Sequence, residues 1–338
     1  MFSGKRPWHA ASCRGLVTAV CAILYHALVT VCGAENPSPI DSTELMKQVA
    51  PTIVKIEAID RQGPLEGTGF FVDENGTIAT SYSVGGESTE IEVIAGSLRL
   101  PAERLLADLR SGLALLKITA KTPLLRLAEE PAAVGASTVA IGYPLGGDLA
   151  LQEGTIVARE IRSGSRIFAT THLRALIQAQ PGMGGAPILN HQGQVLGIVI
   201  SRTENSVGCF ALPAMALRKV LSDHATYGEV RHGWIGVELE DFDPSNESPQ
   251  ARIRALVEGG PSVGSGLAVG DIVLRVGMTP VKNAYDILDA SFFLSAGRDE
   301  TVVVDRNGQV ISMVITPTEH PAQARMRRSS KSAALDTD

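Results

Sequence analysis

The stretch Pro181–Pro187 constrains the fold of this chain most strongly. It reads Pro-Gly-Met-Gly-Gly-Ala-Pro and lies between two apolar runs, at residues 173–179 and 188–200. Glycine reaches backbone conformations that other residues avoid, so the run predicts a tight turn between two strands. Taken alone, the glycines are equally consistent with a plain connecting loop that carries no function.

The composition favours a protein built mainly from strands. The chain has 338 residues, of which 44% are hydrophobic and 20% are charged, which is enough for about two to three domains with hydrophobic cores. Its apolar runs are short, rich in β-branched residues and separated by glycines and prolines. This pattern indicates many short strands rather than long helices, and the predicted fold class is mainly β.

Residues 1–34 are typical of a signal peptide. Basic residues precede the apolar stretch 15–34, and small residues at Cys32 and Ala34 suit cleavage after Ala34. An uncleaved N-terminal anchor is the alternative, because the run approaches the ~20 residues that a membrane span requires. We expect export to the periplasm or another extracytoplasmic compartment, contact with a membrane only if the segment is retained, and a linker over residues 35–47.

Charge and residue spacing exclude several classes of function. Loss of residues 1–34 removes three basic residues and no acidic one, which takes the formal net charge from −6 to −9. An acidic chain is a poor ligand for nucleic acid, so no nucleic-acid partner is expected. The cysteines and histidines lack zinc spacing and no nucleotide-binding motif occurs, so we expect no metal and no cofactor. Cys209, which follows the signal, is predicted to be a buried small hydrophobe.

Local patterns place several elements. Residues 43–49 and 213–224 read as helices, and another helix is expected from about Asn283. Asn75-Gly76 and Asn307-Gly308 each stand between two strand-like runs, which predicts two hairpins.

Four further blocks occur in the order, and near the spacing, of the HtrA/Deg-type serine peptidases. They are residues 67–76, 113–118, 140–146 and 193–200. The glycine-rich stretch itself resembles the nucleophile turn of that family, Pro-Gly-Asn-Ser-Gly-Gly-Pro. The resemblance implies a trypsin-like peptidase domain over residues 48–224, with a chymotrypsin-like double β-barrel.

A second module, residues 232–318, resembles a PDZ domain. Its most specific block is the run Gly-Leu-x-x-Gly-Asp-Ile-Val-Leu at residues 266–274. Residues 319–338 are basic and then rich in Ser and Ala, and we expect a disordered tail there. The expected architecture is therefore a double β-barrel followed by one PDZ domain.

The resemblance places the catalytic triad of the family at Ser83, Gly112 and Gly184, the positions of its histidine, aspartate and serine. A serine peptidase requires a hydroxyl nucleophile, a histidine base and a carboxylate that orients this base. Glycine has no side chain and a hydroxyl is a weak base, so the triad positions are degenerate. We therefore expect no catalytic residue and no enzyme.

Some features of a peptidase site do not need side chains. The amides of Gly182 and Gly184 form a candidate oxyanion loop, and Met183 is expected to fill space in the cleft. The alternative is relocated chemistry. Ser81 and Ser83 carry hydroxyls, and His172 and His191 flank the glycine-rich turn in the sequence.

PDZ domains bind extended peptides by β-augmentation and hold a terminal carboxylate with backbone amides. The resemblance implies a carboxylate loop and an apolar pocket for the last side chain. The candidate residues are Trp234, Ile235, Gly236, Val237, Leu239, Ile287 and Leu288. Ile287 and Leu288 are equally consistent with ordinary core positions, because a helix that faces a sheet buries such residues.

The leading hypothesis is a proteolytically inactive HtrA-like protein that binds peptide C-termini or unfolded segments as a scaffold, sensor or regulator. One alternative is an active HtrA-like serine endopeptidase with a relocated catalytic site. Another is a holdase chaperone in protein quality control. The resemblance also implies a homotrimer or a mixed oligomer with active relatives.

Overall fold

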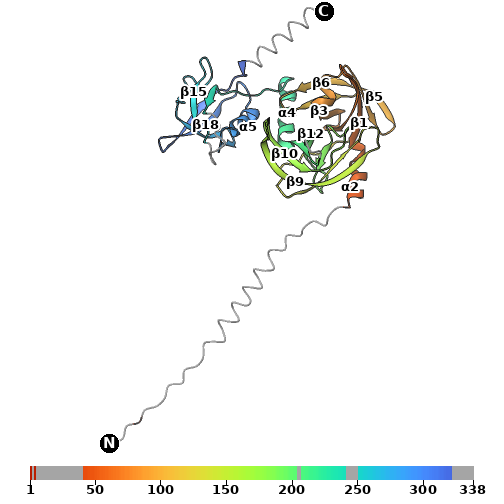
Figure 1. Cartoon of the computed structure of the whole chain (residues 1–338), viewed down its shortest axis with the longest axis horizontal. Coiled ribbons are helices and arrows are strands. Elements are labelled where there is room, and N and C mark those ends of the chain that lie inside the picture. The colour runs from red at the N-terminus through yellow and green to blue at the C-terminus, as the bar shows by residue number, and fades with distance from the viewer. Residues whose placement is uncertain (2–3, 5–40, 204–206, 241–249, 322–338) are drawn as a thin grey trace, which may run out of the picture. The chain divides into compact units, whose positions relative to one another are not determined.

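The computed structural model describes residues 1, 4, 41–203, 207–240 and 250–321 (Figure 1). Nearly all of the predicted signal peptide and most of the predicted tail lie outside these residues. Within the described ranges, no helix is both long and apolar enough to cross a membrane.

The described chain begins with helix α2, Ser42–Val49. The Asp41 side chain caps it by accepting a hydrogen bond from the Thr43 amide at 3.0 Å. Leu45 and Val49 are buried, and a 3₁₀ turn, η1 (Ala50–Thr52), leads into the first strand.

The first half of the peptidase-like region is one antiparallel sheet of seven strands (Figure 1). In spatial order it runs β5-β4-β1-β2-β3-β7-β6. The helical turn α3, Tyr82–Gly85, follows the third strand. Asn75-Gly76 joins two paired strands as predicted, and Gly76 has a φ of +90°. The strands are β1 (Ile53–Asp60), β2 (Gly63–Phe71), β3 (Thr77–Ser81), β4 (Glu90–Ala95), β5 (Leu98–Pro101), β6 (Glu103–Asp108) and β7 (Leu113–Lys117).

The second half is a closed barrel in the order β10-β13-β12-β11-β8-β9, followed by helix α4 (Ala214–Tyr227). Pro181–Pro187 lies between β10 and β11, where the sequence predicts a turn. Cys209 is fully buried and desolvation raises the pKa of its thiol to about 12, as expected for a small core residue. The strands are β8 (Ser137–Gly142), β9 (Ala150–Ser163), β10 (Arg166–Leu176), β11 (Pro187–Leu189), β12 (Val195–Arg202) and β13 (Cys209–Pro213).

The C-terminal module has a four-stranded sheet, β17-β16-β18-β19, a two-stranded ribbon, β14-β15, and helix α5 (Asp286–Phe293). Asn307, with φ 55°, and Gly308, with φ 83°, form the predicted turn of its last hairpin. The mainly β prediction is thus confirmed. The strands are β14 (Val237–Leu239), β15 (Ile253–Leu256), β16 (Ile272–Val276), β17 (Thr279–Pro280), β18 (Glu300–Arg306) and β19 (Gln309–Ile315).

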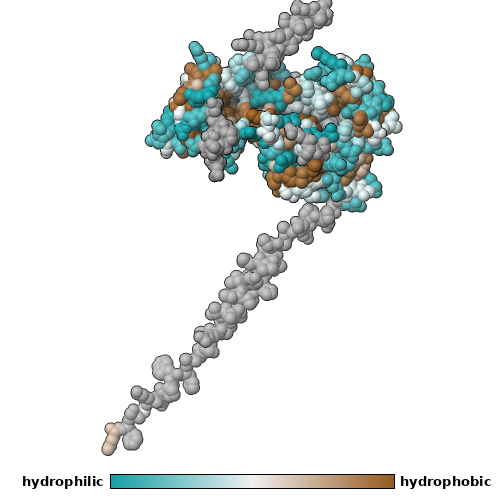
Figure 2. Space-filling model, viewed as in Figure 1, coloured by the Kyte–Doolittle hydropathy of each residue, from teal (hydrophilic) through white to brown (hydrophobic). Residues whose placement is uncertain are grey.

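The visible face of the described part mixes hydrophilic and hydrophobic residues (Figure 2). Exposed apolar side chains include Met278 in the β16–β17 turn, which is 93% exposed, and Leu109, which is 73% exposed. Exposed apolar residues of this kind are ordinary in folded proteins and need no functional explanation.

An ion pair between the buried Asp271 and the partly exposed Arg306 stabilises the C-terminal module. Asp271 is 1% exposed and accepts hydrogen bonds from Arg306 Nε at 2.7 Å and from the Ala268 amide at 2.9 Å. The hydrogen bond from Arg306 outweighs burial and lowers the pKa of Asp271 below its usual 3.8. A carboxyl group whose pKa is lower in the folded state stabilises the fold above the unfolded-state pKa, and this stabilisation is lost as pH falls.

We predict that Asp271→Asn lowers the unfolding free energy of this module by about 1–2 kcal/mol at pH 7, because the buried carboxylate loses its charge-assisted hydrogen bonds from Arg306. The deficit against wild type should narrow as pH falls below about 4. Denaturant unfolding followed by Trp234 fluorescence measures it, with exposed Glu258→Gln as the matched control. An equal deficit at pH 7 and pH 3 would contradict this assignment.

Candidate functional site

The glycine-rich turn of the barrel lies directly against the first sheet. The Thr68 amide donates to the Gly184 carbonyl at 2.9 Å, and Thr68 Oγ1 donates to the Gly182 carbonyl at 3.0 Å. Gly182 and Gly185 have φ angles of +88° and +86°. A Cβ on Gly185 would lie 2.1 Å from the Thr68 carbonyl oxygen. Only glycine therefore fits at position 185.

The structure brings together the three positions at which the resemblance places the triad. The Tyr82 amide donates to the Gly112 carbonyl at 2.6 Å, which joins the segments of Ser83 and Gly112. A Cβ built on Gly184 would lie 3.7 Å from Ser83 Oγ and 3.1 Å from Ser81 Oγ. The hydroxyls of Ser81 and Ser83 are 2.9 Å apart, and Ser83 is exposed whereas Ser81 is buried. A hydroxyl pair thus lies beside the turn.

Backbone amides at the turn are free to bind a ligand. Gly182 and Gly184 are partly exposed, and within the described part of the chain neither of their amides donates a hydrogen bond. Preorganised amides of this kind can stabilise an oxyanion. The prediction that Met183 fills the cleft is wrong. Its side chain is fully buried in the barrel core, because a flexible apolar side chain packs there beside residues such as Ile188.

His172 and His191, which flank the turn in sequence, do not complete a triad. His172 is 3% exposed, its ring stacks on Phe168 at 4.3 Å, and its Nδ1 lies 2.8 Å from the Thr170 carbonyl. Burial lowers the pKa of its imidazole to about 4. Neither histidine forms a hydrogen bond with the serine hydroxyls in the described residues.

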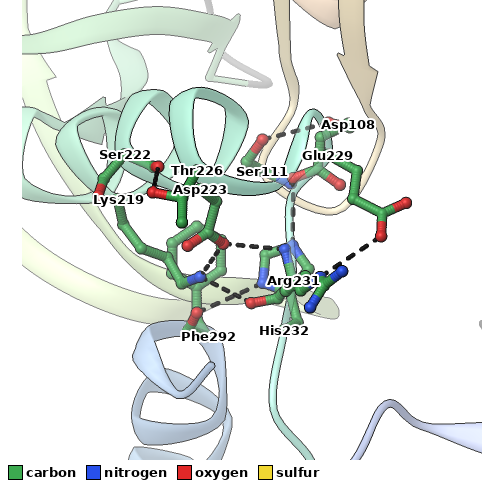
Figure 3. A network of polar contacts seen from close by, with 10 residues as sticks. All are labelled: Asp108, Ser111, Lys219, Ser222, Asp223, Thr226, Glu229, Arg231, His232 and Phe292. Carbon is green, nitrogen blue, oxygen red and sulfur yellow. Dashed lines mark hydrogen bonds and ion pairs between the residues drawn. The ribbon is translucent and has the colours of Figure 1, made fainter. Parts of the chain in front are cut away.

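A histidine–carboxylate pair does occur at the start of the C-terminal module (Figure 3). His232 Nε2 lies 3.2 Å from Asp108 Oδ2, and its Nδ1 lies 3.3 Å from the Phe292 carbonyl. Both ring nitrogens are therefore occupied, so the imidazole cannot also accept a proton from a hydroxyl. Burial alone would raise the pKa of Asp108, but the hydrogen bonds from His232 and Ser111 lower it overall. The pair has a structural role, and its 124-residue separation gives no sequence signal.

The polar network continues into helix α4 (Figure 3). The buried Asp223 carboxylate accepts hydrogen bonds from Lys219 Nζ and from the Arg231 amide, the latter at 2.9 Å. Lys219 Nζ also donates to the Arg231 carbonyl at 2.7 Å. These contacts hold the segment that leads from α4 to Trp234.

A cavity of about 390 Å³ lies beside Trp234. Five of the seven predicted PDZ ligand residues line it, whereas Gly236 and Leu239 do not, and Leu239 packs against the module core. Ile287 is 9% exposed and also belongs to that core, and Leu288 is 37% exposed. The lining residues are Arg110, Ala169, Trp234, Ile235, Val237, Ile287, Leu288, Ser291 and His320.

Ile235, which lines this cavity, and its neighbour Gly236, which does not, have unused backbone amides. The Gly236 carbonyl accepts hydrogen bonds from the Val257 amide at 2.8 Å and from Ser262 Oγ at 2.6 Å. By contrast, the amides of Ile235 and Gly236 donate to no acceptor among the described residues. Strand β14 pairs only with β15 in this part of the chain, so one of its edges remains open. The loop can bind an anion and the open edge can pair with an extended peptide.

Comparison with protein families defines the class. Residues 67–198 match the trypsin-like peptidase domain family, and residues 233–316 match the PDZ domain family. The chain therefore carries a trypsin-like peptidase domain and one PDZ domain, as predicted.

The relatives of the chain are more specific. Proteins of Pseudomonas putida (28% identical over 76% of this chain) and Halomonas elongata (31% over 75%) are both named probable periplasmic serine endoprotease DegP-like. The chain spans 57% and 56% of their lengths.

Solved structures agree with this assignment. The HtrA-type protease AlgW with tripeptide has a TM-score of 0.69 at 22% identity, over 83% of this chain and 98% of that protein. The serine endoprotease from Yersinia pestis has a TM-score of 0.62 at 25% identity, over 83% and 99%. The predicted resemblance to the HtrA/Deg-type serine peptidases, with one PDZ domain, is thereby confirmed.

These comparisons contradict the prediction that the chain is not an enzyme. The relatives are named serine endoproteases and the structural neighbours are HtrA proteases, which points to a protease rather than a pseudoenzyme. The prediction rested on the missing histidine, aspartate and nucleophile at Ser83, Gly112 and Gly184. It treated the hydroxyls of Ser81 and Ser83 and the backbone amides of the turn only as an alternative.

The glycine-rich turn makes a matched pair of substitutions informative. Gly185→Ala should destabilise the protein by about 3 kcal/mol, because it combines a strained positive φ with a clash against a backbone oxygen. Gly184→Ala should cost clearly less, about 1 kcal/mol, because its φ is not positive and its Cβ would meet only side-chain atoms, those of Ser81, Val84 and Ser83. Urea unfolding followed by circular dichroism compares them, and equal losses would contradict the observed turn.

Proposed function

We propose that the protein is an exported HtrA-type endopeptidase whose PDZ domain selects peptides by their C-terminal ends. The observation that carries the proposal is the pair of unused amides at Ile235 and Gly236, the first of which belongs to the lining of a largely apolar cavity. A terminal carboxylate accepts hydrogen bonds from such amides, while the last side chain packs against Ile287 and Leu288. The peptide backbone extends the open edge of β14.

The same proposal includes an extracytoplasmic location and self-assembly. The names of the relatives include the word periplasmic, and the signal-like residues 1–34 agree with it. Association of several copies through the peptidase domain follows from the resemblance to HtrA proteins.

For the cleavage step, we assign the nucleophile to the Ser83 hydroxyl, hydrogen-bonded to Ser81. Ser83 is exposed, and its Oγ lies 3.7 Å from the position of a Cβ on Gly184, whose amide donates to no acceptor in the described residues. Its oxygen attacks the peptide carbonyl carbon and loses its proton to water. The amine leaves with a proton from water, and a second water hydrolyses the resulting ester. In the described residues no histidine reaches Ser83, so the rate should resemble the ~10³–10⁴-fold acceleration that remains when a triad is removed.

Peptide binding is tested by titration of the full chain, followed by Trp234 fluorescence. A peptide with an apolar last residue and a free carboxylate should bind about 10–100 times more tightly than its C-terminal amide, because hydrogen bonds to a charged group are strong. Leu288→Ala should weaken binding of the free acid several-fold, whereas Leu98→Ala, an exposed leucine outside the cavity, should not. Equal affinity for acid and amide would contradict carboxylate recognition.

Proteolysis is tested with casein and with a fluorophosphonate label. Because no base among the described residues activates Ser83, the wild-type protein should cleave casein and take up the label only over long incubations with the protein in molar excess. Ser83→Ala should lose both activities, and Ser81→Ala should weaken them by about tenfold, as for one lost hydrogen bond. Ser165→Ala, at an exposed position in the β9–β10 turn, is the control and should match wild type. No cleavage by wild type, or undiminished cleavage by Ser83→Ala, would reject this assignment.

A further inference from the structure

One residue that lines the PDZ cavity comes from the peptidase domain. Arg110 lies in the turn between β6 and β7, at Asp108–Gly112, and borders the same cavity as Trp234 and Ile235. The sequence alone does not connect Arg110 with the PDZ loop, because more than 120 residues separate them.

The guanidinium of Arg110 is held in place by a short hydrogen-bonded chain. Arg110 Nη2 donates to Ser291 Oγ at 3.2 Å, and Ser291 Oγ donates to the Gly233 carbonyl at 2.6 Å. Ser291 belongs to helix α5, and Gly233 immediately precedes Trp234. The side chain is therefore fixed next to the carboxylate loop.

This guanidinium has unused hydrogen-bonding capacity. Arginine carries five N–H donors, and Arg110 makes the single hydrogen bond to Ser291 and no ion pair among the described residues. Burial lowers the pKa of the Arg110 guanidinium, and the nearby Asp108 charge offsets only part of this effect. The Asp108 carboxylate, two residues earlier, is bound by His232 and Ser111 instead. A partly buried cation with free donors is most stable when an anion joins it.

Residues that line the cavity thus carry complementary groups for one ligand. The amides of Ile235 and its neighbour Gly236 donate to no acceptor among the described residues, and the Arg110 guanidinium forms no ion pair there. We propose that Arg110 is a specificity-determining residue that binds the carboxylate at the C-terminal end of the peptide, together with these amides. This inference rests on the proposed peptide-binding function and adds a contact from the peptidase domain.

A carboxylate at the end of a peptide has two sources, the terminal group and an acidic side chain beside it. Three peptides separate them: a free acid with neutral side chains, its C-terminal amide, and the amide with aspartate as the penultimate residue. The test uses the full chain and follows Trp234 fluorescence. It compares wild type with Arg110→Gln, which keeps a donor for Ser291 but removes the charge.

We expect Arg110→Gln to weaken binding of the free acid at least tenfold and to leave the neutral amide unchanged, which is the loss typical of a charged hydrogen bond. The affinity of Arg110→Lys for the free acid should lie between those of wild type and Arg110→Gln, because lysine keeps the charge but lacks the planar guanidinium group. Arg202→Gln makes the same change in net charge at an exposed position of the barrel and should match wild type. A loss confined to the aspartate peptide would still place a carboxylate at Arg110, with the side chain as its source.

If Arg110→Gln prefers the free acid over the amide as strongly as wild type does, the proposed role of Arg110 is wrong. The proposed peptide binding would remain intact. Failure of wild type to bind any of the three peptides would overturn both. Circular dichroism of each variant establishes that the fold is retained, and the intermediate affinity expected of Arg110→Lys separates the loss of charge from a local distortion.

Discussion

The backbone contact between Thr68 and the glycine-rich turn is the constraint on which the peptidase domain depends. The Thr68 amide and hydroxyl donate to the Gly184 and Gly182 carbonyls, and no side chain fits at Gly185. The contact joins a strand of the first sheet to the barrel. The turn also lies against Ser81, and the amides of Gly182 and Gly184 donate to no acceptor among the described residues.

Both candidate sites are built on a glycine-containing loop. Carbonyl groups of each loop accept hydrogen bonds, whereas two of its amides donate to no acceptor in the described residues. In the peptidase domain Gly182 has a φ of +88°, and in the PDZ domain Gly236 has a φ of +76°. The two loops differ in what surrounds them. Serine hydroxyls lie beside the first, whereas an apolar cavity and the Arg110 guanidinium lie beside the second. The first suits a developing oxyanion and the second a stable carboxylate.

Local patterns predicted much of this structure. The Asn75-Gly76 and Asn307-Gly308 hairpins, the turn at Pro181–Pro187 and the loop around Gly236 each depend on conformations that few residues adopt. Contacts between distant segments had no such signal: His232 with Asp108, and Arg110 with Ser291. The orientation of Met183 was also mispredicted, because neighbouring residues in a turn can point either into the core or into the cleft. The inference that the chain is not an enzyme is contradicted as well, because it gave the side chains at three positions more weight than the similarity of the whole chain to serine endoproteases.

The proposed carboxylate recognition depends most directly on the amides of Ile235 and Gly236. The decisive measurement is the ¹H–¹⁵N spectrum of the full chain, recorded with the free-acid peptide and with its C-terminal amide. Hydrogen bonding to a carboxylate should move the two amide proton resonances strongly downfield with the free acid and leave them nearly unchanged with the amide. Identical shifts with both peptides, or shifts confined to other parts of the chain, would show that this loop is not the carboxylate site.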